Sequence, residues 1–413
     1  MDISLLQRIQ TFKELSDLHD RVLLLESNEY ADPYGSFEWI LLAGAQNILA
    51  ENARWDELSD FLKGHFDCPI LPAYLSYDLK NDLENVFSSN PDATHFPALA
   101  CWEPASLIAK KRNGQFVQWG QPISVATYDA TTTNPFPSIS MQPSYTEAQY
   151  TEKFERLKHH ILRGDIYEVN FCIHFGTIVP ELDPVQLFLR LNALSPAPFA
   201  CLLKDRDNWL VGSSPERFLV KKGEQLISQP IKGTIRKGNS DEQNIQLADQ
   251  LRNDPKERSE NVMIVDLVRN DLSHYAKRNS VQVKELCGIY PFATVMHMIS
   301  TIESQLSDHR LGVEALKKAF PMGSMTGAPK IRAMQLAEDA ENFKRGIYAG
   351  AIGYFTPEGN YDFSVVIRSF TWNSRSGYLS FSTGSAITQK ANAKDEYREC
   401  LLKAEALLKS LSQ

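Results

Sequence analysis

The clearest helical pattern in the chain lies between residues 146 and 164. Phe154, Leu157 and Ile161 fall three and four residues apart, which is the spacing of one face of an α-helix. Thr146 and Gln149 stand where a capping box would satisfy the first free amides of that helix. The pattern therefore predicts a helix that begins after Thr146 and buries an apolar face.

A period-two pattern follows directly. Residues 169–175 alternate large apolar side chains with smaller ones, which predicts a β-strand. The opposite face of this strand carries Glu168, Asn170, Cys172 and His174. A sheet face of this polarity either meets solvent or lines a binding site, and the pattern leaves both open.

The second half of the chain contains more predicted strands than helices. Strand patterns occur between residues 209 and 236 and in 348–355, 361–372 and 378–383, and a hairpin-like turn at 373–377 joins the last two. Helices are predicted after Pro255 and from about Lys394. Because strands outnumber crossover helices, we expect an α+β fold with antiparallel sheets rather than a doubly wound parallel sheet.

One segment divides the chain. The run Tyr128–Ser138 is rich in Thr, Ser and Pro and has the composition of an extended connector. We therefore expect an N-terminal subdomain and connector over residues 1–140 and a catalytic domain over residues 141–413.

Composition narrows the class of protein. The chain has 413 residues, of which 43% are hydrophobic, and its net charge of −8 argues against nucleic acid or an anionic membrane as partner. Six cysteines without a Cys-x-x-Cys pair predict free thiols in a reducing compartment. No signal-peptide pattern is visible, and the most apolar stretch, Trp39–Ala45, is too short to span a bilayer. A soluble cytoplasmic protein is expected.

Two acidic pairs are candidates for a metal site. Glu257 and Glu260, like Glu396 and Glu399, stand three residues apart, so each pair shares a helix face. Either pair alone is typical of a solvated face. The apolar run Val262–Val265, however, indicates that Glu260 enters a core, where a carboxylate needs a cation. Oxygen ligands without His or Cys favour Mg²⁺ over zinc.

Other residues are ambiguous from the pattern alone. Arg368, among apolar neighbours of a predicted strand, suits either a bound carboxylate or an internal salt bridge. Glu216 could be a surface charge paired with Arg217, and His297 is by default a hydrogen-bonded core histidine. The small-residue loop Gly323–Lys330 precedes a predicted helix, whose free amides could seat a carboxylate.

Several motifs occur together and in order: Ser213–Phe218, Pro230–Thr234, Glu257–Leu267, Gly323–Lys330 and the acidic pair at 396–399. By these motifs residues 144–407 resemble the chorismate-utilising enzymes. The resemblance implies two β-sheets packed as a sandwich with flanking helices, and a site between the sheets. It also implies that chorismate, a dicarboxylate, binds together with Mg²⁺.

The resemblance assigns roles to particular positions. It implies direct Mg²⁺ ligation by Glu260 and Glu399, and ligation through water by Glu257 and Glu396. Glu216 matches the general acid that protonates the departing 4-hydroxyl. Substrate-binding or pocket-lining positions of the family correspond to Tyr348, Arg368, Gly384, Lys403, Thr326 and His297.

Lys232 and Glu168 distinguish among family members. Anthranilate synthases carry Ala at the position of Lys232, whereas members that aminate chorismate at C4 carry Lys there as the proposed nucleophile. Isochorismate and salicylate synthases place a base lysine at the position of Glu168, and the amine-forming members typically have Gln. Glu168 could hold ammonium, accept its proton, or pair with Lys232; for attack, the pKa of Lys232 should be depressed.

The resemblance thus implies that ammonia converts chorismate to 4-amino-4-deoxychorismate, toward p-aminobenzoate and folate. No glutaminase pattern is seen, so we expect a separate glutamine amidotransferase subunit or free ammonia, and no fused lyase domain. Two alternatives are the first component of an anthranilate synthase and a non-catalytic chorismate-binding regulatory protein. Leu25–Ser27 resembles the family's tryptophan site, but its partner segment, 194–199, matches only loosely, which weakens the expectation of feedback inhibition by tryptophan.

Overall fold

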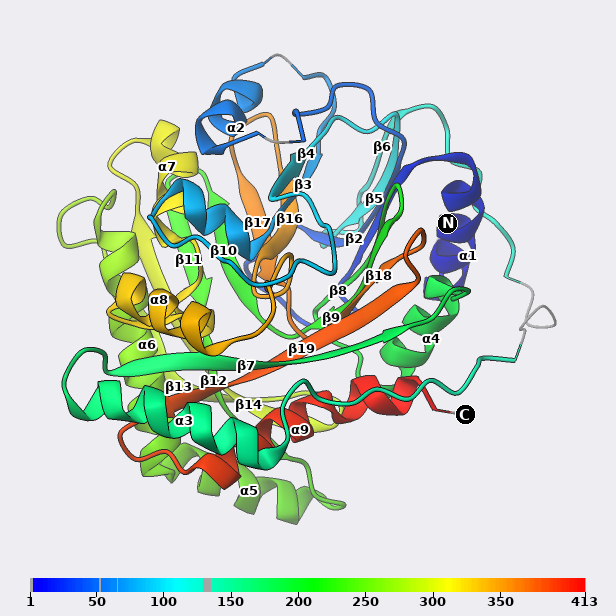
Figure 1. Cartoon of the computed structure of the whole chain (residues 1–413). Helices are drawn as coiled ribbons and strands as arrows, with labels where there is room; N and C mark the ends of the chain where they lie inside the picture. The colour runs from blue at the N-terminus through cyan, green and yellow to red at the C-terminus, as the bar shows by residue number, and fades with distance from the viewer. Residues whose placement is uncertain (1–2, 52, 65, 129–134, 413) are drawn as a thin grey trace.

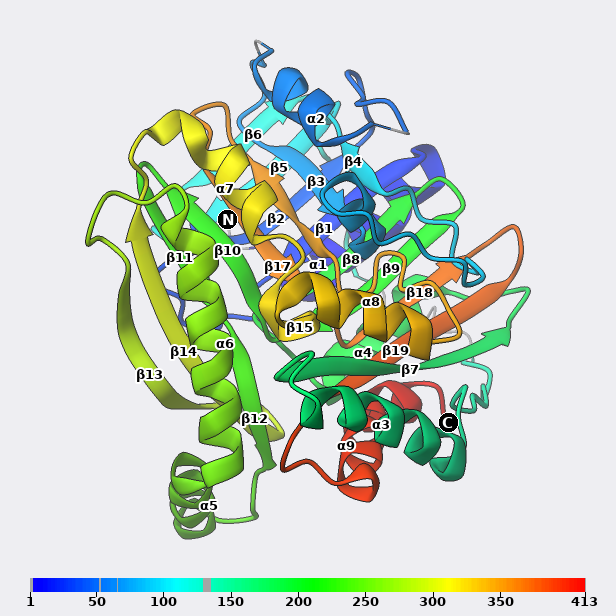
Figure 2. The ribbon, with the colours of Figure 1, turned by 60° about the vertical axis from the view of Figure 1, so that its left-hand side comes forward.

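Two antiparallel β-sheets face each other, and helices cover the outer side of each (Figures 1 and 2). The computed structural model describes residues 3–51, 53–64, 66–128 and 135–412. The prediction of an α+β fold with two packed sheets is confirmed. Of the predicted connector, residues 129–134 lie outside the described residues.

The first sheet has ten strands within the described residues. In spatial order they are β15 (Gly327–Ala328), β7 (Glu168–Ile178), β19 (Tyr378–Thr388), β18 (Ser369–Asn373), β9 (Asn208–Ser214), β8 (Phe199–Asp205), β1 (Arg21–Glu26), β2 (Phe37–Ala43), β5 (Ser106–Lys111) and β6 (Phe116–Gly120). The long strands β7 and β19 pair in one unbroken register, from Glu168 opposite Thr388 to Ile178 opposite Tyr378.

The second sheet has nine strands in the same part of the chain. Their order is β12 (Ile231–Arg236), β14 (Val295–Gln305), β11 (Gln225–Gln229), β10 (Arg217–Lys222), β17 (Tyr361–Val365), β16 (Ala351–Phe355), β3 (Leu71–Leu75) and β4 (Leu99–Cys101), with β13 (Gln282–Pro291) paired to β14. Strands from the first 140 residues therefore extend both sheets, and the division at residue 140 stays a prediction.

The helices fall into two groups. On the ten-stranded sheet lie α1 (Leu5–Leu18), α3 (Glu147–Leu162), α4 (Pro184–Leu194), α8 (Lys330–Ala340) and α9 (Ala393–Ser410). On the nine-stranded sheet lie α2 (Trp55–Leu62), α5 (Asp241–Asn253), α6 (Pro255–Ser273) and α7 (Gly312–Ala319). Figure 2 shows α6 running along β12 and β14.

Alternation along the strands produces the layers of the core. On β1, Val22 and Leu24 face the helices, whereas Leu23 belongs to the cluster between the two sheets. On the other side, Ile264 and Val268 of α6 pack against the nine-stranded sheet. Each fully buried aliphatic side chain of this kind contributes about 1.5–3 kcal/mol. The two sheets are thereby held at a fixed separation, and a site between them has rigid walls.

The helix starts that local sequence signals predicted are confirmed. Thr146 and Gln149 form the predicted capping box of α3, and Pro255 is the first residue of α6. The predicted strand over 361–372 is wrong, because the chain leaves one sheet after Val365 and enters the other at Ser369. The predicted strand over 348–355 begins only at Ala351, since the residues before it form a turn.

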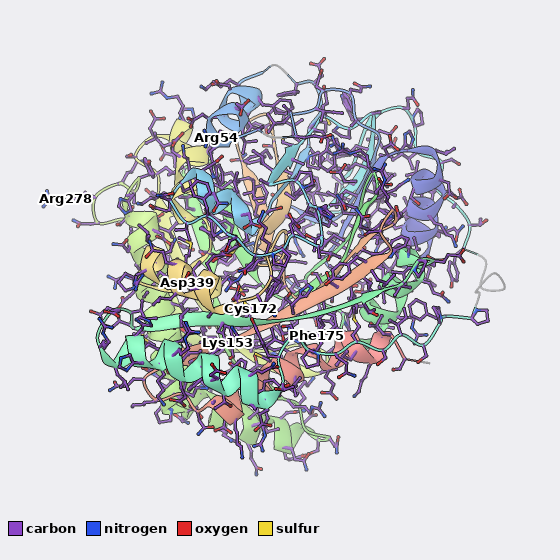
Figure 3. All side chains as sticks on the ribbon, viewed as in Figure 1. Arg54, Lys153, Cys172, Phe175, Arg278 and Asp339 are labelled. Carbon is purple, nitrogen blue, oxygen red and sulfur yellow. The ribbon has the colours of Figure 1, made fainter. Side chains whose placement is uncertain are left out.

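Side chains fill the space between the ribbons, as Figure 3 shows. Cys172 and Phe175 mark the buried middle of β7, whereas Arg54 and Arg278 lie exposed at the periphery. All six cysteines are buried and unpaired, as predicted. In the part of the chain that the structure describes, no helix has the length and apolarity to cross a bilayer.

Candidate active site

A cleft between the two sheets gathers most of the predicted site residues. Its lining includes Asn170, Ser382, Thr383 and Gly384 from the ten-stranded sheet, Lys232, Gly233, Thr234 and His297 from the nine-stranded sheet, Glu257, Glu260, Glu399 and Lys403 from α6 and α9, and Glu216, Tyr348 and Arg368 from connecting segments. Three predicted residues, Glu168, Thr326 and Glu396, do not line it.

Lys232 stands at a break in the pairing of β12. The register between β12 and β14 shifts between Ile231 and Thr234, and Gly233 has a left-handed backbone with φ 89°. A side chain on Gly233 would come within 3.1 Å of a Glu257 carboxylate oxygen. The irregularity therefore brings the strand close to α6 and turns Lys232 into the cleft.

The Lys232 ammonium is paired with a carboxylate of the opposite sheet. Its Nζ donates to Glu168 Oε1 over 2.6 Å, and both side chains are buried. Burial alone would lower the pKa of Lys232, but Glu168 and then Glu260 override it and raise the pKa above its ordinary value. The expectation of a depressed pKa is therefore wrong for the protein without ligand. Of the roles considered for Glu168, the structure places it as the partner of Lys232.

Glu216 is a buried acid rather than a surface charge. It is only 4% exposed, between β9 and β10, and burial raises its pKa to about 7. The neighbouring Arg217 points elsewhere, where it makes ion pairs with Asp32 and Asp362. The surface pairing of Glu216 with Arg217 is therefore not found, and at neutral pH the carboxyl that faces the cleft is partly protonated.

The two acidic pairs converge, as their helices pack on opposite sides of the cleft. The ammonium of Lys256, the second residue of α6, lies among all four carboxylates. Its Nζ is 2.7 Å from Glu396, 3.8 Å from Glu260 and 4.0 Å from both Glu257 and Glu399. The prediction that Glu260 lies at a buried position is confirmed, since it is 5% exposed.

The chemistry of this cluster fits a hard divalent cation. Glu260 Oε1 and Glu396 Oε2 are buried without a hydrogen-bond partner. Burial raises the pKa of Glu260 to about 8 and also raises those of Glu257 and Glu396. With Lys256 between them, no three His, Cys, Asp or Glu side chains of the described residues already stand in metal-binding geometry. The donors are all oxygen, as Mg²⁺ requires, and two of the oxygens accept no hydrogen bond.

Arg368 reaches the cleft because the chain changes sheets just before it. It follows the end of β17, and its left-handed backbone has φ 53°. Among the described residues no carboxylate lies within ion-pair distance of its guanidinium, so the internal salt bridge is not found. Burial lowers the pKa of Arg368 to about 10, which still leaves it charged at neutral pH. Among the described residues, the cleft thus presents a guanidinium without an ion-pair partner.

Lys403 and Gly384 meet at the same wall of the cleft. Lys403 Nζ donates to the carbonyl of Gly384 over 2.8 Å and to Glu399 Oε1 over 2.7 Å. Burial alone would lower the pKa of Lys403, but Glu399 raises it. Lys403 correspondingly lowers the pKa of Glu399 against the effect of burial. This end of the site is therefore an ion pair fixed to β19.

His297 and Thr326 have different surroundings. His297 lines the cleft, its Nδ1 lies 2.9 Å from the Thr234 hydroxyl, and burial lowers its pKa to about 3. It is therefore a neutral hydrogen-bonding group. The Thr326 hydroxyl instead donates to the carbonyls of Met322 and Gly323 within its own loop. The amides at the start of α8 do not line the cleft either; from this loop only Ser324 and Met325 do.

Two charged groups near the site were missed by sequence reasoning. The sequence does contain a signal for Lys256, because a lysine four residues before Glu260 on a helix lies on the same helix face. The sequence contains no comparable signal for Arg345, since its partners come from several segments. Arg345 pairs with Glu341 and donates to the carbonyls of Asn170 and Met325. Arg345 thereby fixes β7 and the loop at 322–326 around the cleft.

The segments compared with the tryptophan site lie around a separate cleft. Leu25, Glu26 and Ser27 line it together with Pro198 and Phe199. Glu26 is already engaged there by Arg8, 2.7 Å away. The weakened expectation of tryptophan binding stays a prediction.

The chain belongs to the chorismate binding enzyme family, whose model matches residues 21–409. It is similar to aminodeoxychorismate synthase component 1 of Escherichia coli, at 37% identity over 66% of this chain and 59% of that relative. The chain therefore spans less than two thirds of that relative's length. The family resemblance drawn from the motifs is confirmed.

Two further comparisons point to neighbouring members. The chain is similar to anthranilate synthase component 1 of Thermus thermophilus, at 29% identity over 89% of this chain and 81% of that relative. Among solved structures it is similar to anthranilate synthase component I from Streptococcus pneumoniae, with a TM-score of 0.78 and 22% identity over 92% of this chain and 93% of that chain. The second likeness concerns the fold.

Proposed function

We propose that this chain is an aminodeoxychorismate synthase component, which replaces the 4-hydroxyl of chorismate with an amino group supplied as ammonia. The observation that carries the proposal is Lys232, a buried amine that faces the same cleft as the acid Glu216. The similarity to the named synthase of Escherichia coli supports this reading over other family reactions. The product would serve p-aminobenzoate and folate synthesis, and six free thiols suit a cytoplasmic site.

The cleft suits a dianionic substrate. Arg368 offers a guanidinium without a carboxylate partner among the described residues, and a planar guanidinium binds a carboxylate through two parallel hydrogen bonds. Tyr348 lines the cleft beside it. One carboxylate of chorismate would bind at this end, near Lys403 and the backbone of Gly384.

The other carboxylate would face the glutamate cluster. Four carboxylates repel a bound anion, so this end needs a cation. Mg²⁺ held by Glu260 and Glu399, with Glu257 and Glu396 acting through water, would neutralise the ring carboxylate and fix its position. The oxygens of Glu260 and Glu396 that accept no hydrogen bond support this assignment.

Lys232 must lose a proton before it can act as a nucleophile. The nearest acceptor is Glu168, 2.6 Å away, so we propose that the proton passes from Nζ to Oε1. The free amine then forms a bond to ring C2, the ring electrons shift, and the C4–O bond breaks. Glu216, whose pKa burial raises to about 7, gives its proton in its protonated form to the departing hydroxyl, which leaves as water.

The second half of the reaction reverses these transfers. Ammonia forms a bond to C4, the ring electrons shift back, and the C2–N bond breaks, so that Lys232 leaves as the neutral amine. The excess proton of the new amine passes to Glu216, and Glu168 returns its proton to Lys232. The enolpyruvyl side chain stays on the ring. Water is the only other product, so the protein ends in its starting state.

Ammonia would come from a glutamine amidotransferase partner. A glutaminase needs a reactive thiolate, but all six cysteines are buried, and burial raises the pKa of each thiol. The name "component 1" of the Escherichia coli relative is consistent with a second component. Free ammonium should substitute for the partner in solution.

The second candidate is the first component of an anthranilate synthase, which the Thermus relative favours. Its chemistry requires loss of the enolpyruvyl group and has no need of an amine at the position of Lys232. A non-catalytic chorismate-binding protein would have no use for a protonated Glu216 facing an amine.

Mass analysis of the products from chorismate, Mg²⁺ and ammonium separates the three functions. We expect an amino product that retains the enolpyruvyl group. Release of pyruvate with a smaller aromatic product would indicate anthranilate synthesis, and recovery of unchanged chorismate would indicate a binding protein.

A further inference from the structure

The side chain of Lys256 occupies the centre of the glutamate cluster. Its Nζ is 2.7–4.0 Å from carboxylate oxygens on all four glutamates. It makes a hydrogen bond to only one of them, Glu396 Oε1. An ammonium has three N–H donors, so it cannot satisfy four carboxylates. Glu260 Oε1 and Glu396 Oε2 remain buried without a hydrogen-bond partner, although Glu260 Oε1 lies 3.8 Å from Nζ.

A dication bound by these carboxylates would need the same position. Oxygen ligands lie about 2.0–2.1 Å from Mg²⁺, so the ion would stand at the point where the carboxylates converge. An ammonium at that point would overlap the ion and repel it strongly. The two cations therefore exclude each other.

The main chain at Lys256 is fixed, so only its side chain can move away from the glutamate cluster. Its backbone amide donates to Asp254 Oδ1 over 2.8 Å at the start of α6, which fixes the main chain. The side chain is 31% exposed, whereas that of Lys232 is 9% exposed. A route to solvent is therefore open to the Lys256 ammonium but not to the Lys232 ammonium.

We propose that Lys256 is the resident counter-cation of the cluster, which bridges α6 and α9 in the metal-free protein and swings into solvent when a divalent cation binds. The inference rests on the metal site of the proposed function and adds an affinity-setting residue to it. Lys256 would offset the mutual repulsion of the four carboxylates, of which those of Glu260 and Glu396 are buried. It would also lower the affinity for the cation by competing with it.

Removal of this competitor should tighten metal binding. We expect Lys256→Gln to bind Mg²⁺ about tenfold more tightly than the wild type in calorimetric titration, within the usual range of coupling between two ligands. In EDTA the variant should melt at a lower temperature, and Mg²⁺ should raise its melting temperature more than that of the wild type. Lys394→Gln, which removes an exposed lysine from the first turn of α9, should change neither property.

The wild type provides a test that needs no variant. A brief pulse of acetic anhydride, followed by peptide mass analysis, should modify Lys256 more in Mg²⁺ than in EDTA, while Lys394 reacts equally in both. If Mg²⁺ protects Lys256 or leaves its reactivity unchanged, or if Lys256→Gln binds Mg²⁺ no more tightly, Lys256 is a fixed bridge and the proposal is wrong. Absence of any Mg²⁺ binding also overturns it. Neither readout depends on turnover, so the proposed amination is judged separately by its products.

Discussion

At the residue scale, burial is the main influence on the protonation of two side chains that line the cleft. It keeps Glu216 partly protonated near neutral pH, with a pKa of about 7, and His297 neutral, with a pKa of about 3. Lys232 is the exception, because its pairing with Glu168 outweighs burial and keeps the amine charged. The cleft therefore holds a carboxyl whose pKa lies near neutral and a charged amine paired with a buried carboxylate.

Lys232→Ala tests the nucleophile. Loss of the amine should slow formation of the amino product on the order of 100-fold or more, because covalent catalysis is removed while the carboxylate contacts remain. Rapid-quench mass spectra of the wild type with chorismate and no ammonium should show an adduct on the peptide that contains Lys232. Lys284→Ala, on the exposed strand β13, is the matched control. A wild-type rate for Lys232→Ala, without any adduct in the wild type, would favour direct attack by ammonia.

The pKa of Glu216 predicts a pH dependence. A general acid works only while protonated, so kcat at constant free ammonia should fall as pH rises through about 7. Glu216→Gln cannot donate a proton; its rate should fall about 10²–10⁴-fold and lose this alkaline decline. Steady-state rates between pH 5.5 and 9 would measure both effects. An alkaline decline that survives in Glu216→Gln would assign it to another group.

At the element scale, two helices far apart in the sequence complete one site. Glu257 and Glu260 come from α6 and Glu396 and Glu399 from α9, and each pair shares a face because it is spaced by three residues. Burial of the two helix faces on one cleft, rather than either pair alone, makes the cluster suitable for a cation. Cation binding should therefore weaken when either helix loses one of its carboxylates.

Metal dependence tests that expectation. EDTA should abolish turnover, and Glu260→Gln or Glu399→Gln should raise the Mg²⁺ concentration needed for half-maximal rate about tenfold or more, since each removes a charged ligand. Asp266→Asn on α6, whose side chain is 65% exposed and pairs with Arg269, is the control for loss of charge. Full activity in EDTA would contradict the metal assignment.

The elements also show where sequence reasoning succeeds and fails. The capping box at Thr146 and the start of α6 at Pro255 are local signals, so they were predictable. The change of sheet before Arg368 was not, because an apolar run reads as one strand whichever sheet each half joins. The pairing of Lys232 with Glu168 stayed one of three options for a related reason: the two residues come from opposite sheets. Contacts of that kind depend on tertiary packing.

At the scale of the whole molecule, the cleft is a product of the packing of two large sheets. Strands from both ends of the chain contribute to each sheet, so the walls that carry Lys232 and Gly384 are fixed by the entire core. The described residues supply an acid, an amine and a carboxylate cluster, but their six thiols are buried and none is activated. On the proposed function, the chain would therefore use ammonia that is made elsewhere.

The nitrogen source follows from that division. The purified chain should form the amino product with ammonium but not with glutamine, because hydrolysis of glutamine needs a thiolate that burial disfavours at every cysteine. Addition of a cognate amidotransferase should confer use of glutamine. Parallel assays with the two nitrogen sources, each with and without the partner, measure this directly. Variants that replace Cys172 or Cys400 should leave nitrogen use unchanged if they remain folded. Turnover driven by glutamine in the purified chain alone would mean that a reactive thiol is present after all.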